Sequence, residues 1–119
     1  MTQHELEAAC RVWRIRLGLK KWTIFATLGR CVTDPDYTKG ELKRGNQGQS
    51  HWDAESRTAW VNVWRGCKDP LGTLVHELIH VRLEGHRTDP WPLKDEAYER
   101  GVDAIADLLL KRNETIWIE

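Results

Sequence analysis

The chain has 119 residues, 40% of them hydrophobic, and its 18 Lys and Arg residues balance its 18 Asp and Glu residues, so the formal net charge at pH 7 is zero. This length and composition indicate one globular domain over residues 1–119 and exclude a disordered or fibrous chain. A chain without excess positive charge is a poor match to nucleic acid, and no apolar run is long enough to cross a membrane, so we expect neither as a partner.

Cysteine usage and the N-terminus bear on the compartment. The three cysteines are odd in number, and none belongs to a CxxC pair. The first residues lack the basic-then-apolar layout of a secretory signal. We therefore expect a reducing, cytoplasmic setting.

The N-terminal part of the chain is expected to form a helix and then a strand. Thr2 and Glu5 are spaced as a capping box, which predicts a helix that ends at Gly18. Its apolar stripe has helical spacing and consists of Leu6, Ala9, Cys10, Trp13 and Leu17. Apolar and polar residues then alternate over residues 22–28, which predicts a strand. Residues 33–50 are rich in Asp, Pro, Gly and Asn and are expected to form a long loop.

A hairpin is predicted over residues 52–64, with its turn near residues 53–56. Side chains alternate between the two faces of a strand. One face of the second strand would carry Ala59, Val61 and Val63. The other face would carry Trp60, Asn62 and Trp64.

Two helices are predicted in the last part of the chain. Asp69 and Pro70 are a strong helix start, because Asp can cap free N–H groups and Pro gives up no hydrogen bond at the first helical position. This helix should run to about Glu84 and stop at Gly85, and its buried stripe consists of Leu71, Leu74, Val75 and Leu78. A last helix should begin between residues 90 and 95 and end near residue 112. The order predicts the α+β class: an N-terminal helix, a small, mostly antiparallel twisted sheet, and two C-terminal helices.

The second of these three helices carries the motif His76-Glu77-Leu78-Ile79-His80. Two His residues four positions apart on a helix face the same way, so both imidazoles can bind one metal ion, and Glu77 can take a proton from metal-bound water. The alternative is a solvent-facing helix that contains these residues by chance. The cap, the apolar stripe and the glycine stop argue against it.

A catalytic zinc ion takes three protein ligands and keeps one position for water, so a third ligand is expected downstream. The candidates are His86, Glu96 and Glu99. His86 would complete an HExxHxxxxxH pattern. In metzincins that pattern also needs a glycine three residues after the second His, where this chain has Leu83, although Gly85 could make a similar turn.

A helical wheel separates the two glutamates. The buried direction of the last helix is set by Tyr98, Val102, Ile105 and Leu109. Glu96 falls on the solvent-facing side, whereas Glu99 falls at the border between core and surface, where a ligand at a cleft wall would lie. Glu99 is therefore the predicted third ligand. Asp103, one turn further on, would either orient a zinc-bound His or form an ordinary surface ion pair.

The segments TLVHELIH (residues 73–80) and YERGVDAIA (residues 98–106) resemble the gluzincin metallopeptidases. They are most similar to the small minigluzincins and to metallopeptidases encoded by phages and prophages. The likeness covers about residues 52–110, and its HExxH half is more specific than its glutamate half.

This resemblance implies a function and a set of site residues. The expected zinc ligands are His76, His80 and Glu99. Glu77 would act as general base and acid in peptide hydrolysis, and Asp103 would support a ligand as part of an ExxxD pattern. The family also implies a strand beside the cleft, which matches residues 58–64, and the backbone of that strand could pair with a peptide substrate.

Two alternatives to this zinc-dependent peptidase remain open. The first is a zinc-stabilised regulatory or interaction module without turnover, since a small domain gains stability from a metal ion and Trp60 and Trp64 could form a partner surface. The second is a repair-type HExxHxxxxxH peptidase that uses His86 as its third ligand.

Two further features are left with several interpretations. The donor that stabilises the oxyanion together with zinc could be Tyr98, His51 or Arg100. The apolar C-terminal tail, residues 113–119, would either cover the substrate groove or pack on the body of the domain.

Overall fold

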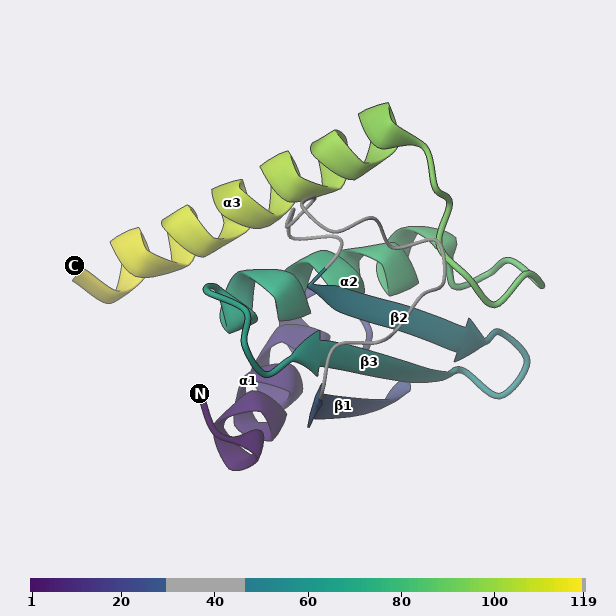
Figure 1. Cartoon of the computed structure of the whole chain (residues 1–119), viewed down its shortest axis with the longest axis horizontal. Coiled ribbons are helices and arrows are strands. Elements are labelled where there is room, and N and C mark those ends of the chain that lie inside the picture. Colours follow the sequence, from purple (N-terminus) through teal and green to yellow (C-terminus); the bar gives the residue numbers. More distant parts are fainter. Residues whose placement is uncertain (30–46, 119) are drawn as a thin grey trace.

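Three helices and three strands make up the part of the chain described by the computed structural model, which comprises residues 1–29 and 47–118, with side chains as far as residue 112. In chain order they are α1 (Gln3–Arg16), β1 (Thr23–Gly29), β2 (Gly48–Asp53), β3 (Thr58–Trp64), α2 (Pro70–Glu84) and α3 (Glu96–Ile118) (Figure 1). The predicted α+β class is confirmed. Most of the predicted loop over residues 33–50 lies outside the described residues, and its last three residues belong to β2.

The first two helices begin as the sequence predicts. Thr2 Oγ1 accepts a hydrogen bond from the Glu5 N–H at 3.1 Å, and Glu5 Oε1 accepts one from the Thr2 N–H at 3.0 Å, so the capping box of α1 is complete. The Asp69 carboxylate caps α2 by accepting a first-turn N–H at 3.0 Å. At the other end of α2, a Cβ on Gly85 would lie 2.7 Å from the Trp22 ring. Glycine is therefore required where the chain leaves this helix.

The start of α3 is decided by a contact with the sheet. Pro90, part of the predicted start signal, uses its C=O to accept a hydrogen bond from the Trp52 N–H of β2 at 3.0 Å. The helix begins only at Glu96, where the Asp95 carboxylate accepts a hydrogen bond from the Tyr98 N–H at 2.9 Å.

The end of α3 differs from the prediction. The helix continues to Ile118 instead of ending near residue 112, because neither Gly nor Pro follows that residue to interrupt it. The side chains of residues 113–119, the predicted apolar tail, lie outside the described part of the chain. No helix of the described residues is long and apolar enough to cross a membrane.

β3 is the central strand of the sheet. It pairs in parallel with β1 and antiparallel with β2, so the strand order is β1-β3-β2. The sheet is evenly mixed rather than mostly antiparallel, because the short turn over residues 54–57 folds β2 onto one edge of β3 and leaves the other edge to β1. The prediction that residues 58–64 offer free backbone groups to a substrate is wrong, since both edges of this strand are paired.

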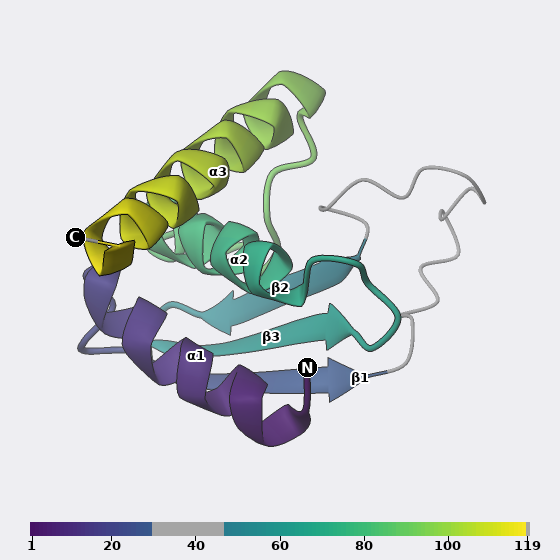
Figure 2. The same cartoon turned by 90° about the vertical axis from the view of Figure 1, so that its left-hand side faces the viewer.

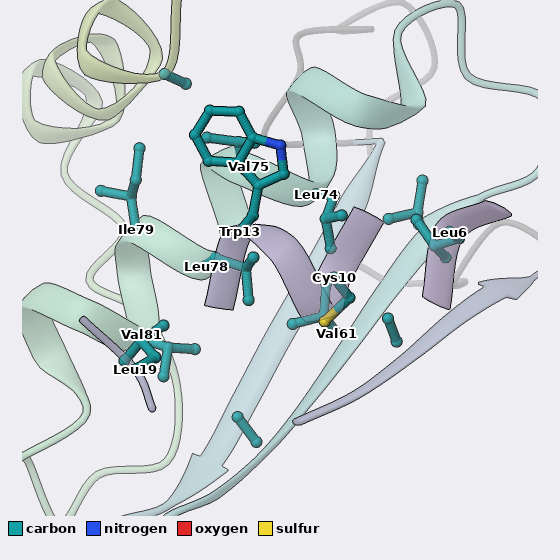
Figure 3. Close-up of a cluster of buried hydrophobic side chains, with 14 of the residues drawn as sticks. Leu6, Cys10, Trp13, Leu19, Val61, Leu74, Val75, Leu78, Ile79 and Val81 are labelled. Atoms are coloured by element: carbon teal, nitrogen blue, oxygen red, sulfur yellow. The ribbon is translucent and has the colours of Figure 1, made fainter. Parts of the chain in front are cut away.

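The helices form two layers on one face of the sheet. α1 and α2 pack against the strands, and α3 lies on the outer side of α2 (Figure 2). Residues 72–81 of α2 are consequently all buried. The core between α1, α2 and the sheet is formed mainly by Leu6, Cys10, Trp13, Val61, Leu74, Val75 and Leu78 (Figure 3).

Aromatic side chains cross the opposite face of the sheet. Trp60 stacks on Phe25 of β1 with ring centroids 6.4 Å apart and on His51 of β2 with centroids 5.0 Å apart. The His51 ring also contacts Trp91, from the segment between α2 and α3, at 5.2 Å. We call these four residues the aromatic row. Its Phe25, Trp60 and Trp91 side chains are 53%, 37% and 45% exposed.

Candidate metal centre

The two His residues of the HExxH motif lie side by side on the buried α2 helix. Their side chains are 0% and 1% exposed, and His76 Nε2 lies 3.1 Å from His80 Nε2. A spacing of four residues puts both rings on the side of α2 that faces α3. α2 thus places two imidazole nitrogens close enough together for both to bind the same ion.

Glu99 of α3 closes the cluster. Its two carboxylate oxygens lie 2.8 Å from His76 Nε2 and 2.9 Å from His80 Nε2. The potential ligand atoms of these three residues all lie within 4.8 Å of one another, so the cluster could hold a metal ion. Glu99 is only 31% exposed, as expected for a residue at the border of the core.

The other two candidates for a third ligand lie elsewhere. Glu96 is 70% exposed and lies 3.8 Å from Arg100 of the next turn. His86 follows the end of α2, and its side chain is exposed. Neither belongs to the cluster found among the described residues, and an HExxHxxxxxH site that uses His86 is therefore not formed.

The buried side of α3 is rotated relative to the predicted one. Val102 and Ala106 are 1% and 0% exposed, whereas Ile105, expected in the core, is 43% exposed. The buried direction is thus nearer to Glu99 than the wheel indicated. The reason is that α3 packs mainly on α2, so its contact stripe is narrow.

A second carboxylate lies behind each imidazole. Asp103 Oδ1 is 2.8 Å from His76 Nδ1, and Glu84 Oε2 is 2.7 Å from His80 Nδ1. Asp103 was among the sequence candidates, but Glu84 was not. Its position four residues after His80 on the same helix was the signal that could have identified it.

Glu84 is a buried carboxylate that joins α2 to the segment leading into α3. Besides His80, it accepts hydrogen bonds from the Tyr98 hydroxyl at 3.0 Å, from the Leu93 N–H at 2.7 Å and from Arg87 at 3.1 Å. It is only 3% exposed, so each bond offsets part of the cost of burying its charge.

The three residues considered as oxyanion donors lie in different surroundings. The Tyr98 hydroxyl is donated to Glu84, and the Arg100 side chain is 71% exposed beside Glu96. His51 lies in the aromatic row, on the face of the sheet opposite to α2.

The general base candidate, Glu77, is buried against the sheet. It is 3% exposed, and its Oε2 accepts a hydrogen bond from the Ser50 hydroxyl of β2 at 2.7 Å. Burial raises the pKa of Glu77, against the opposing effects of His76, His80 and the Ser50 hydrogen bond. Glu77 thus interacts electrostatically with His76 and His80, but its hydrogen-bond partner belongs to β2.

The cluster shifts the pKa values of its own members. Burial by itself would lower the pKa of His80, but the hydrogen bond to Glu99 and the charge of Glu77 raise it to about 9. The pKa of His76 is raised by the same two carboxylates, again against burial. Burial would raise the pKa of Glu99, but the hydrogen bonds from both imidazoles lower it to about 2. A metal ion that binds here must therefore displace protons.

The two edges of the sheet are not equivalent. At the β1 edge, the Gln3 side chain of α1 donates to the Ala26 C=O at 2.8 Å and accepts from the Leu28 N–H at 2.7 Å, so an amide side chain covers this edge. At the β2 edge, the antiparallel register turns the backbone groups of Gly48 and Ser50 away from β3. Among the described residues, none pairs through its backbone with these groups.

Gly48 lets α2 approach this edge closely. A Cβ at this position would lie 2.5 Å from Thr73 Cγ2 and 3.3 Å from Glu77 Cγ. Any side chain here would push α2 away from β2. The glycine therefore keeps Glu77 next to the edge strand.

Comparisons of the chain with protein families, with curated proteins and with solved structures find no match.

Proposed function

We propose that the protein is a zinc-dependent metallopeptidase with His76, His80 and Glu99 as zinc ligands and Glu77 as general base. The observation that carries this proposal is the three-residue cluster with a carboxylate behind each imidazole. The resemblance of the HExxH segment to gluzincins points to the same reaction.

The donor set fits zinc in particular. Two imidazole nitrogens and one carboxylate oxygen are the ligands of many catalytic zinc sites, in which a fourth position stays open for water or substrate. Calcium and magnesium prefer oxygen ligands, and this cluster offers two nitrogens. The carboxylates at both Nδ1 atoms would favour the tautomer in which each Nε2 is free to bind the metal.

In this proposal, zinc and Glu77 have separate roles in peptide hydrolysis. When held by His76, His80 and Glu99, zinc would supply a water of lowered pKa and a positive charge that polarises the substrate carbonyl. Glu77 would accept a proton from the attacking water and would then pass this proton to the leaving nitrogen. A carboxylate whose pKa is raised by burial is suited to both steps.

The peptide substrate would lie along β2. This strand, rather than β3, has outward backbone groups at Gly48 and Ser50, and an extended peptide can pair with such an edge. The same strand holds Glu77 through Ser50. A bond presented at this edge would therefore lie close to the general base.

We propose a cytoplasmic location because of the state of the cysteine side chains. Cys10 and Cys67 are free thiols in the described residues, as expected for a protein of the reducing cytoplasm.

The proposal is tested by metal analysis and a peptidase assay on the full chain. We expect about one zinc ion per chain, its loss in His76→Ala or His80→Ala, and hydrolysis of fluorescently labelled casein by the zinc-loaded protein. Glu77→Gln should keep zinc and lose activity by at least about 100-fold. Zinc-loaded Glu77→Gln with full activity would contradict the assigned role of Glu77.

A metal-stabilised interaction module is the second candidate, and the exposed aromatic row favours it, since three large rings on one sheet face could bind a partner. In that case the chain binds zinc but cleaves no casein, and Glu77→Gln changes nothing that can be measured in a binding assay.

A further inference from the structure

Ser50 is the one polar side chain on the face of β2 that packs against α2. Its neighbours on that face are Gly48 and Trp52. Its side chain is 0% exposed, and its hydroxyl donates to Glu77 Oε2 at 2.7 Å. A hydroxyl buried without a partner costs free energy, so this hydrogen bond fixes how both groups are oriented.

A purely structural role explains the choice of residue poorly. A buried strand position favours a β-branched or aromatic side chain, and alanine fills nearly the same volume as serine without a polar group. What serine adds is one O–H donor. Its single proton points to the carboxylate that the proposed mechanism uses as a base.

Glu77 needs such a partner because the two neighbouring imidazoles attract its carboxylate toward themselves. The charges of His76 and His80 act on this carboxylate, and a Glu side chain has several rotatable bonds. Among the described side chains, no group other than the Ser50 hydroxyl donates a hydrogen bond to Glu77. Without this hydrogen bond, the carboxylate would be free to turn toward the imidazoles.

We propose that Ser50 is a positioning residue that holds Oε2 of Glu77 and so leaves the other carboxylate oxygen to exchange the proton with water. This inference rests on the proposed peptidase function. Because the backbone of Ser50 also faces the outer edge of β2, where no described residue pairs with it, this one residue would both pair with the substrate backbone and orient the base. Misorientation of a catalytic group by about 1 Å can cost about 100-fold in rate.

The test compares zinc-loaded Ser50→Ala, Ser50→Cys and Ser50→Thr with the unchanged chain, on a quenched fluorescent peptide built around a bond that the protein cleaves in casein. We expect kcat to fall by about 10- to 100-fold in Ser50→Ala, with KM and zinc content unchanged. Ser50→Cys, similar in size but a weak donor, should resemble Ser50→Ala. Ser50→Thr, which keeps the hydroxyl, should recover most of the rate.

Thr73→Val is the matched control. It removes the hydroxyl of another fully buried residue, one whose Oγ1 lies 3.7 Å from the Cys67 sulfur and is not hydrogen-bonded to Glu77. Its kcat should stay within about twofold of the unchanged chain. An equal loss of rate in Thr73→Val and Ser50→Ala would overturn the proposal, because removal of a buried hydroxyl that does not contact Glu77 would then have the same effect.

A second measurement does not depend on activity. In the metal-free protein, Ser50→Ala should lower the thermal unfolding midpoint in the unchanged background but not in a Glu77→Ala background, where the hydroxyl has already lost its acceptor. Equal shifts in the two backgrounds, or an unchanged kcat in Ser50→Ala, would overturn the role of Ser50 while the peptidase function stands. An inactive zinc-loaded unchanged chain would overturn the peptidase function, and the inference with it.

Discussion

Each histidine of the candidate metal centre is hydrogen-bonded at the ring nitrogen that points away from Glu99. His76 and His80 meet Asp103 and Glu84 there, at 2.8 and 2.7 Å. Such contacts fix the ring orientation and the tautomer and raise the basicity of the ligand. The two supports differ in burial, because the side chain of Asp103 is 33% exposed whereas that of Glu84 is buried. Asp103 is therefore the one that can be removed with little damage to the fold.

Asp103→Ala is expected to lower zinc affinity by about 10- to 100-fold, because His76 loses the group that orients it. Competition with a fluorescent zinc chelator measures this. Asp107→Ala, on an exposed position of the same helix, is the control and should bind zinc as the unchanged chain does. Equal affinities of the two variants would show that Asp103 gives no support to the ligand.

Zinc uptake at pH 7.5 should release about one proton or more, because His80, with a pKa near 9, is protonated in the metal-free protein and must lose its proton to bind the metal. The sign follows from the raised pKa: release is largest well below pH 9 and declines as the pH approaches it. Calorimetry in buffers of different ionisation enthalpy counts the protons. The exposed His86 should not contribute, so His86→Ala should give the same number. No release at pH 7.5 would contradict the prediction.

At the scale of elements, the positions of α2 and β2 relative to each other decide where Glu77 lies. Gly48 permits the contact, and Ser50 makes it specific. The opposite edge of the sheet is covered by the Gln3 amide, whereas the outward backbone groups of Gly48 and Ser50 on β2 have no backbone partner among the described residues.

Gly48→Ala should destabilise the protein by about 1 to 3 kcal/mol and reduce peptidase activity, because its Cβ would lie 2.5 Å from Thr73 Cγ2 and α2 would have to shift. Chemical denaturation and the casein assay measure both effects. Thr73→Ser removes the clashing methyl group and keeps the hydroxyl, so Gly48→Ala combined with Thr73→Ser should recover part of both losses. A double variant no better than Gly48→Ala would show that this clash is not the cause.

At the scale of the whole molecule, α3 is the outermost layer and packs mainly on α2 (Figure 2). Its contact with α2 is narrow, and the polar groups of Glu99, Asp103 and Tyr98 on this helix all point to His or Glu residues of α2. A metal ion bound to Glu99 and the two imidazoles would clamp the two helices together.

Removal of zinc by a chelator should therefore speed amide hydrogen exchange in α3 much more than in β1 and β3. The unfolding midpoint should also fall, since a ligand at 100 times its Kd contributes about 2.7 kcal/mol to the folded state. Hydrogen exchange monitored by mass spectrometry resolves the elements, and Glu99→Ala with zinc should resemble the metal-free unchanged chain. Uniform acceleration in all elements would contradict a clamp between α2 and α3.

The sequence by itself determined the features that depend on residues close along the chain. The capping box at Thr2, the Asp69 start of α2, the alternation in β3 and the His76–His80 pair are each decided within one or two turns of helix or one strand, by local hydrogen bonds and by periodicity. Even Glu99 could be selected, since a helical wheel needs only the residues of its own helix.

Only the tertiary structure decided the relations between elements far apart in the sequence. Strand order made β3 central and placed β2 at an edge of the sheet, and the packing of α3 on α2 turned Ile105 outward and brought Asp103 to His76. Ser50 became a partner of Glu77, 27 residues away along the chain, through the same packing. Such contacts depend on which faces of the helices and the sheet bury the most apolar surface against one another. A pattern of neighbouring residues in the sequence does not determine this.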